Sequence, residues 1–269
     1  MNELLEPLLG APVTLEELKH KPGRRTTLRA RGARRNAIVK VYASTRAPTV
    51  AARLGALAGG PDEVEVPEVL LCDPEKHLVV LSEVPGTPFR EPLLAGDGET
   101  CERAGAAIGA WHRFWVGASP GALVPHTAER ELEILEARIE SAPDGIASLV
   151  RAELPTVAGD SWPPATVVHR DLYEEQIMVG DRVGLIDLDD CALGPPELDI
   201  ANVCGHIRLL ERRSGKELGP MRAVFLRGYG SAGPPLDPVL FDRCLGLTLL
   251  RLCCIHGDPS LLQGMGAAR

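Results

Sequence analysis

An acidic residue, an amide and a second acidic residue follow one another closely in the second half of the chain, at Asp171, Gln176 and Asp187. Phosphoryl transfer needs such a set, because it depends on an oriented hydroxyl and on metal ions that neutralise phosphate charge. Asp171 could accept the hydroxyl proton. Asp187 could hold Mg²⁺ through its carboxylate, and Gln176 could add an amide oxygen. We expect His169 to brace the loop that carries Asp171.

A β-hairpin is predicted to bring these side chains together. Gly180-Asp181 suits a two-residue turn, with glycine at the first central position. Pairing outward from that turn sets Gln176 opposite Leu185. Residues two apart on a strand share a face, so Gln176 and Asp187 should point the same way at the open end of the hairpin. Asp171 lies in the loop that feeds this end.

The elements that must position this hairpin change in character along the chain. The first part reads as strands around one helix, because β-branched runs alternate with turn residues. Beyond Pro85-Gly86-Thr87-Pro88, apolar residues recur at helical spacing. We predict strands over 13–19, 26–31, 37–42, 64–72 and 77–83 with a helix over 48–57, then helices over 100–114, 126–139, 197–210, 221–229 and 236–255 around a strand-like island at 165–187.

This order predicts an α+β fold of two lobes with a cleft between them. The smaller, β-rich lobe would span residues 1–84 and the larger, helical lobe residues 85–269. The chain of 269 residues is long enough for a core in each lobe.

Composition excludes several classes of partner and site. The net charge of −8 gives no basic footprint for nucleic acid. No apolar run of about 18 residues and no signal peptide are present, so we expect no membrane association. The seven scattered cysteines form no CxxC pair, which favours reduced thiols and argues against zinc. We expect a cytoplasmic protein, monomeric or weakly homodimeric.

Several further patterns have plainer readings. Gly228 to Gly233 matches GxGxxG, but it follows a helical pattern, whereas a dinucleotide-binding turn needs a preceding strand. His256-Gly257-Asp258 repeats the His-x-Asp spacing without the later amide and acid, so we read it as a loop after a helix. Glu174 and Glu175 could attract an ammonium substrate or form a solvated loop face; both readings stay open.

The run from His169 to Asp190 resembles the catalytic and metal-binding segments of the protein-kinase-like superfamily. The closest resemblance is to its aminoglycoside phosphotransferase and choline-kinase-like branch. That branch has a His-x-Asp loop, an Asn or Gln five residues later and an Ile-Asp-x-x-Asp-like segment. The stretch 193–201 is similar to its Gly-Asp-Pro-x-x-Asp-Leu-Ala motif, whose later acid, here Asp199, is structural. The resemblance covers roughly residues 20–230.

The resemblance implies a bilobal protein-kinase-like fold that binds ATP and Mg²⁺ and phosphorylates a small-molecule hydroxyl. Leu81 to Gly86 is similar to the hinge between the lobes, whose backbone holds the adenine. The phosphate-covering loop has only Gly23, and Arg24 and Arg25 beside it could contact phosphate instead. The implied site has Asp171 and His169 as catalytic residues, Lys40, Glu83, Val84 and Arg24 at the nucleotide, and Gln176, Asp187 and Asp189 at the metal.

The sequence also departs from this pattern. Gln176 replaces the usual Asn, and Arg170 is the residue that protein kinases carry there. No Glu or Asp lies between Lys40 and Pro61, so the usual acidic partner of the lysine is missing from the following helix. Two hypotheses follow. The first is a kinase acting on an aminoglycoside-like, amino-alcohol or sugar hydroxyl, and the alternative is a non-catalytic, pseudokinase-type nucleotide-binding module. The gap from Asp187 to Asp199 is too short for a protein-kinase activation loop.

Overall fold

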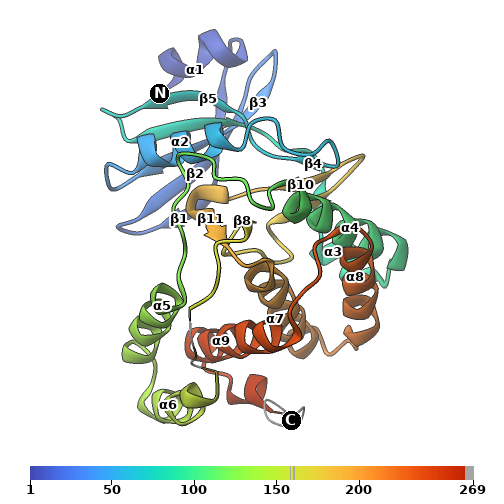
Figure 1. The fold of residues 1–269 in the computed structure, drawn as a ribbon. Helices are drawn as coiled ribbons and strands as arrows, with labels where there is room; N and C mark the ends of the chain where they lie inside the picture. Colours follow the sequence, from blue (N-terminus) through green and yellow to red (C-terminus); the bar gives the residue numbers. More distant parts are fainter. Residues whose placement is uncertain (158, 160, 264–269) are drawn as a thin grey trace.

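The computed structural model describes residues 1–157, 159 and 161–263, and it has a β-rich first part above a helical second part (Figure 1). The predicted α+β fold class is therefore confirmed. The strands are β1 (Thr14–Lys21), β2 (Arg25–Arg31), β3 (Asn36–Tyr42), β4 (Val64–Glu65), β5 (Val69–Asp73), β6 (Leu78–Ser82), β7 (Thr87–Pro88), β8 (Thr166–Val168), β9 (Ile177–Val179), β10 (Val183–Leu185) and β11 (Ala192–Gly194). The helices are α1 (Asn2–Leu9), α2 (Ala47–Ala56), α3 (Arg90–Ala95), α4 (Gly98–Phe114), α5 (Ala128–Glu140), α6 (Asp144–Val157), α7 (Pro196–Ser214), α8 (Gly219–Ala232) and α9 (Pro238–His256), with 3₁₀ turns η1 (Leu188–Asp190) and η2 (Pro259–Leu262).

The first part is built on an antiparallel sheet in the order β1-β2-β3-β6-β5. Successive side chains of a strand point to opposite faces, and β3 uses both. Ala37 and Val39 pack with Leu5 and Leu9 of α1 on one face. Tyr42 packs on the other face, with α2, and Lys40 shares this face by its spacing. The alternation thus directs Lys40 away from α1.

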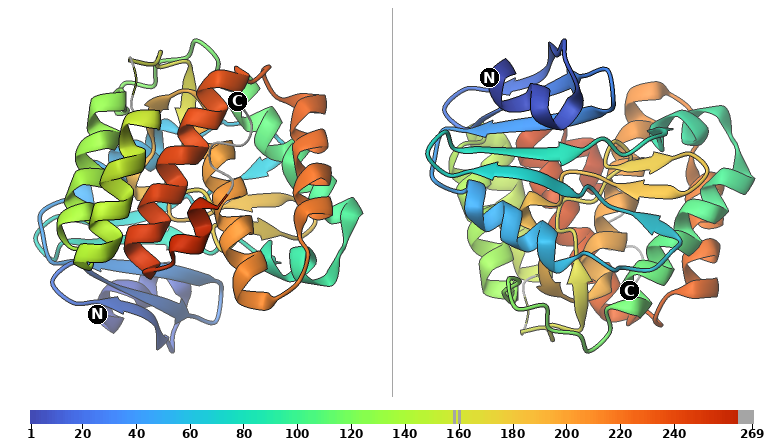
Figure 2. Two further views of the ribbon diagram at one scale, coloured as in Figure 1. Left: turned by 90° about the horizontal axis from the view of Figure 1, so that it is seen from below. Right: turned by 90° about the horizontal axis from the view of Figure 1, so that it is seen from above.

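Helices of the second part lie below its short strands, as the view from below shows (Figure 2). α4 and α8 lie against each other at very close range, because Gly105 and Gly228 have no side chain at the contact. A Cβ on either would lie 2.0 Å from a backbone oxygen of the other helix. Gly228 belongs to the GxGxxG match, which lies on helix α8 up to Ala232. The sequence-based rejection of a dinucleotide-binding turn is confirmed.

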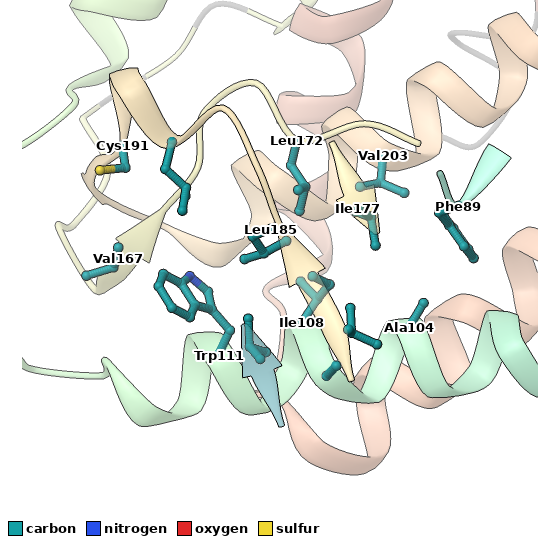
Figure 3. Packing of buried hydrophobic residues seen from close by; sticks show 14 of the residues in the cluster. Phe89, Ala104, Ile108, Trp111, Val167, Leu172, Ile177, Leu185, Cys191 and Val203 are labelled. Carbon is teal, nitrogen blue, oxygen red and sulfur yellow. The ribbon is translucent and has the colours of Figure 1, made fainter. Parts of the chain in front are cut away.

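One hydrophobic core of the second part lies between α4 and the β9–β10 hairpin (Figure 3). Ala104, Ile108 and Trp111 of α4 point toward Ile177 of β9 and Leu185 of β10. All five side chains are buried. The hairpin is therefore held by this packing, and the packing also fixes the position of the polar residues at its open end.

The register predicted for this hairpin is wrong by one residue. Val179 pairs with Val183 and Ile177 with Leu185, so three residues form the turn. A two-residue turn would place Arg182 opposite Val179 and draw its charge toward the core. The observed register buries both valines and lets Arg182 donate to the Val64 carbonyl at 3.0 Å. The backbone of Gln176 then faces Ile186, whose N–H donates to it at 3.0 Å.

The two parts are joined by more than the chain connection. β4 pairs in parallel with β10, and β7 pairs with β9. The predicted strand over 64–72 is present as two strands, β4 and β5, because Pro67, which has no N–H, lies between them. Val84, which follows β6, packs on Gly184, where a Cβ would lie 2.2 Å from Val84 Cγ1. The division at residue 84 stays a prediction.

Three helices were not predicted: α1, α3 and α6. α1 and α6 each contain an internal proline, Pro7 and Pro155, which disfavours a helix by local propensity. The seven cysteines are free thiols, and all but Cys72 are buried, as expected. Within the described part of the chain, no helix combines the length and apolar character needed to span a membrane.

Candidate active site

Lys40 meets two acidic side chains that follow the β9–β10 hairpin. Its Nζ lies 2.7 Å from Asp187 Oδ1 and 2.6 Å from Asp189 Oδ1. Asp187 has a left-handed backbone conformation (φ 61°) and starts the 3₁₀ turn η1 that carries Asp189. That turn aims both carboxylates at β3. A lysine of the first part and two acids of the second part therefore form one cluster, in which Lys40 and Asp189 are buried and Asp187 is partly exposed.

Arg25, at the start of β2, completes this cluster. Its guanidinium donates to both oxygens of Asp187, at 2.8 and 2.9 Å, and also contacts Asp189. Burial alone would raise the pKa of Asp187, but the charges of Lys40 and Arg25 hold it well below its ordinary value. Burial and the neighbouring Asp189 raise the pKa of Tyr42, whose hydroxyl donates to Asp189 at 2.9 Å.

Helix α2 presents arginines to this cluster, where the resemblance leads us to expect an acidic side chain facing the lysine. Its first turn has no acid, and Arg53 from its last turn donates to the Asp189 carbonyl at 2.7 Å. Arg46, just before the helix, pairs with Asp190 at 2.8 Å. Arg53 of the helix and Arg46 just before it therefore fix the position of η1. Asp189 supplies to Lys40 the carboxylate that α2 lacks.

A double-mutant cycle should detect this pairing. Lys40 and Asp189 have side-chain exposures of 6% and 3%, so removing one leaves a buried charge and each single change should be costly. We expect Lys40→Met and Asp189→Asn to couple by about 1–3 kcal/mol in the free energy of unfolding. The exposed pair Arg130–Glu133 is the control and should couple by less than about 0.5 kcal/mol. Additive effects at Lys40 and Asp189 would contradict the pairing.

The loop that carries Asp171 is fixed by Asp199 on α7. The Asp199 carboxylate accepts hydrogen bonds from the backbone N–H groups of His169 at 2.7 Å and Arg170 at 2.8 Å. His112 of α4 lies 3.2 Å from the same carboxylate. Arg170 has φ 74°, an uncommon conformation that these bonds hold in place. The structural role expected for Asp199 is confirmed.

His169 braces the same loop from the other side. Its Nε2 lies 2.8 Å from the Ile186 carbonyl, and its Nδ1 lies 3.4 Å from the Asp171 N–H. Asp171 itself is exposed. Asp171 and Asp187 both act electrostatically on Tyr173 and on Lys21 at the end of β1. The two acids therefore border the same region.

The structure places the remaining predicted site residues as follows. Gln176 is buried, with 6% of its surface exposed. The side chain of Glu83 pairs with Arg29 at 2.7 Å, which leaves its backbone as the group available to a ligand. Val84 is buried against Gly184. Arg24 is exposed, whereas its neighbour Arg25 reaches the acidic cluster.

A cavity of about 390 Å³ opens beside Asp171. Its walls come from the loop that carries Asp171 and from helices α3, α5, α7 and α9. Glu174 lies on this wall with one oxygen that is buried and has no hydrogen-bond partner. Burial and the nearby Glu175 raise the pKa of Glu174 to about 7. His206 also lines the cavity, and its ring stacks on that of Tyr173, with 4.7 Å between the ring centroids.

His206 should make the protein sensitive to acid. Burial and the nearby Arg251 lower its pKa to about 3. The unfolded state therefore binds its proton first, and stability is lost as pH falls below about 6.5. Between pH 8 and pH 5 we expect a loss of about 2 kcal/mol from this group. His206→Phe, which keeps the stacking, should remove that loss in urea unfolding, whereas the exposed control His20→Phe should not. An unchanged pH dependence in His206→Phe would refute this assignment.

Asp187 and Asp189 are the two carboxylates of this cluster that could hold a hard divalent cation. Asp187 and Asp189 direct carboxylate oxygens at one point and already hold two cationic groups, Lys40 and Arg25. Mg²⁺ prefers carboxylate and amide oxygens, and Gln176 supplies an amide nearby in the sequence. No cluster of three or more His, Cys, Asp or Glu occurs among the residues that the structure describes, so a soft-metal site is not indicated there.

Sequence reasoning missed three contributors to this site. It weighed Arg25 only as an alternative to glycine in the phosphate-covering loop, and it did not consider Tyr42 or Arg53. A readable signal existed for Tyr42 alone, because it is two residues beyond Lys40 and so shares its face of β3.

Together, a β-rich lobe with a buried strand lysine, a helical lobe with a braced His-x-Asp loop and an acidic turn between them define a small-molecule kinase with a protein-kinase-like architecture. The particular family follows from the sequence match. Residues 16–239 match the family described as the phosphotransferase enzyme family, and the chain belongs to it. No curated protein matches the chain.

Solved structures with the same fold include three small-molecule kinases. A spectinomycin phosphotransferase in complex with ADP and spectinomycin is 14% identical, with a TM-score of 0.63 over 99% of this chain and 90% of its own. An aminoglycoside-3′-phosphotransferase of type VIII is 20% identical, with a TM-score of 0.66 over 92% and 97%. A choline/ethanolamine kinase family protein from Mesorhizobium loti is 19% identical, with a TM-score of 0.58 over 95% and 86%.

Proposed function

We propose that this protein transfers the γ-phosphate of ATP to a hydroxyl group of a small molecule. The observation that carries the proposal is the cluster of Lys40, Arg25, Asp187 and Asp189. In this cluster, two cationic side chains that can bind phosphate lie beside two carboxylates that can bind a metal ion. The loop that carries Asp171 borders the same region. The ADP bound to the spectinomycin phosphotransferase of the same fold supports the choice of nucleotide.

In this proposal Asp171 orients the acceptor hydroxyl and accepts its proton. The hydroxyl oxygen forms a bond to the γ-phosphorus, the bond from that phosphorus to the β-phosphate oxygen breaks, and ADP leaves. Arg25 turns from the acids toward the phosphates, and Lys40 contacts the phosphates while it keeps its ion pair with Asp189. Asp189 keeps Lys40 in place, the task that an acid of the following helix usually has. Asp199 and His169 hold the loop, so that little reorganisation is needed.

Asp187 and Gln176 would hold Mg²⁺, with Asp189 beside them. When bound, the ion neutralises charge on the phosphates. The backbone of Glu83 and Val84 would receive the adenine, with Arg24 available at the outer edge of the phosphates. We also propose that the nucleotide-binding lobe comprises residues 1–84 and the acceptor-binding lobe residues 85–269.

The non-catalytic alternative loses its motivation. It rested on a Lys40 without an acidic partner, and Lys40 lies within 2.7 Å of two carboxylates. A screen for ATP consumption against hydroxyl-bearing metabolites and antibiotics tests the choice. We expect turnover with at least one acceptor and a rise of melting temperature with Mg-ATP. A melting shift without turnover across the whole panel would instead support a binding module.

A further inference from the structure

The cavity beside Asp171 has an unusual number of arginines on its walls. Besides Asp171, five apolar side chains from α5, α7 and α9 line it. They form an apolar surface against which a small carbon skeleton can pack. Its volume of about 390 Å³ suits a small metabolite better than a large antibiotic. The arginines are Arg90 near its rim, Arg138 on α5, Arg213 on α7 and Arg251 on α9.

Three of these arginines form no ion pair with a carboxylate of the described residues. Arg90 pairs with Glu175 at 3.1 Å. Arg138, Arg213 and Arg251 make no ion pair with any residue that the structure describes. Arg213 instead lies beside the neutral His256, and Arg251 donates to the side chain of Asn202. The excess of unpaired positive charge therefore faces the cavity.

The remaining acids on the wall do not balance this charge. Asp171 is committed to the acceptor hydroxyl under the proposed function. Glu174 is the one other carboxyl of the lining without an arginine partner, and it is buried at 8% exposure. The neighbouring His206 reports the same imbalance, because Arg251 and Arg213 add to burial in keeping it neutral. A cavity for a polycation would need the reverse composition.

We propose that the acceptor is a small hydroxy acid, whose carboxylate binds the arginines of α5 and α7 while its hydroxyl reaches Asp171. This inference rests on the proposed phosphotransfer. Guanidinium groups bind carboxylates through paired N–H donors, which fixes the orientation of the acid as well as its position. The proposed hydroxy acid differs from the acceptors expected from the sequence, which were aminoglycoside-like molecules, amino-alcohols and sugars.

Acceptor pairs that differ in one carboxylate test the inference. Serine would be compared with ethanolamine, glycerate with ethylene glycol and gluconate with glucose, together with an aminoglycoside, by Mg-ATP consumption. We expect the acid of at least one pair to exceed its partner by roughly tenfold or more in kcat/KM, since charge-assisted hydrogen bonds are lost in the partner. Every measured turnover would be repeated with Asp171→Ala to show that it uses the site.

Arginine variants supply an independent readout with the preferred acid. Arg138→Gln and Arg213→Gln should each raise KM for the acid roughly tenfold, and Arg138→Lys should recover part of the loss. Arg212→Gln is the matched control, because Arg212 neighbours Arg213 but contacts Gln263, and its KM should not change. Arg251 is left intact, since Asn202 links it to the catalytic loop through the Leu172 carbonyl. Melting temperatures would show that each variant folds.

The outcomes separate the two proposals. Preference for the acids with loss in both arginine variants supports the inference. Asp171-dependent turnover confined to amines or neutral alcohols overturns the hydroxy acid and leaves phosphotransfer standing. An absence of ATP consumption with every acceptor of the panel, in a protein that binds Mg-ATP, contradicts both.

Discussion

Asp171→Ala is expected to lower turnover by roughly 10²–10⁴-fold while Mg-ATP binding stays nearly unchanged. The loop that carries Asp171 is held by Asp199 and His169 through hydrogen bonds that do not involve its carboxylate. The side chain is exposed at the cavity, so its removal should leave the fold intact. Only the acceptance of the hydroxyl proton is lost. Turnover would be followed by ADP release, and binding by calorimetry with a non-hydrolysable ATP analogue.

The chain offers a matched control in its second His-x-Asp sequence. Asp258 follows the left-handed Gly257 at the end of α9 and caps η2 through the Ser260 N–H at 3.0 Å. The expected loop after a helix is therefore confirmed. Asp258→Ala should cost about 1 kcal/mol of stability through the lost cap, without a change in turnover. Equal turnover in Asp171→Ala and the parent protein would reject Asp171 as the base.

Asp187→Ala is expected to abolish the metal dependence of nucleotide binding. Lys40 and Arg25 both contact Asp187 at 2.7–2.9 Å, as they also contact Asp189, and their charges hold the pKa of Asp187 below its ordinary value, so it is ionised at neutral pH. Without it, the proposed site loses one of the few carboxylates through which Mg²⁺ binds beside substrate phosphates. Melting temperature with ATP, measured with Mg²⁺ and with EDTA, should differ in the parent and coincide in the variant.

Asp181→Ala serves as the control for this second change. Asp181 is exposed at the turn of the same hairpin, away from the acidic cluster. It should retain the full Mg²⁺-dependent shift of the parent. A persistent shift in Asp187→Ala would place the metal elsewhere.

Much of the fold was readable because local patterns agreed with long-range packing. The alternation in β3 put Ala37 and Val39 on one face and Lys40 on the other, and the structure keeps this arrangement. The large helices carried apolar residues at helical spacing over several turns. Helix α1 could not be found this way, since eight residues with an internal proline depend on the sheet beneath Leu5 and Leu9.

The site was less readable where it depends on register or on distant partners. Gly180 suggested a two-residue turn, yet the burial of Val179 and Val183 decided for three. The partner of Lys40 was sought on the next helix, where these acids usually stand, but it comes from η1, far along the chain. Only the folded arrangement reveals such a substitution, because the spacing from Lys40 to Asp189 has no local meaning.

The most direct test of the account follows the γ-phosphate itself. ATP labelled in that phosphate would be incubated with the purified protein, Mg²⁺ and the acceptor that supports turnover, and the products separated. The account predicts that the label moves to a hydroxyl of the acceptor as a phosphate ester, and that Asp171→Ala prevents this. Label found only in ATP or in inorganic phosphate, at the same rate with and without acceptor, would contradict it.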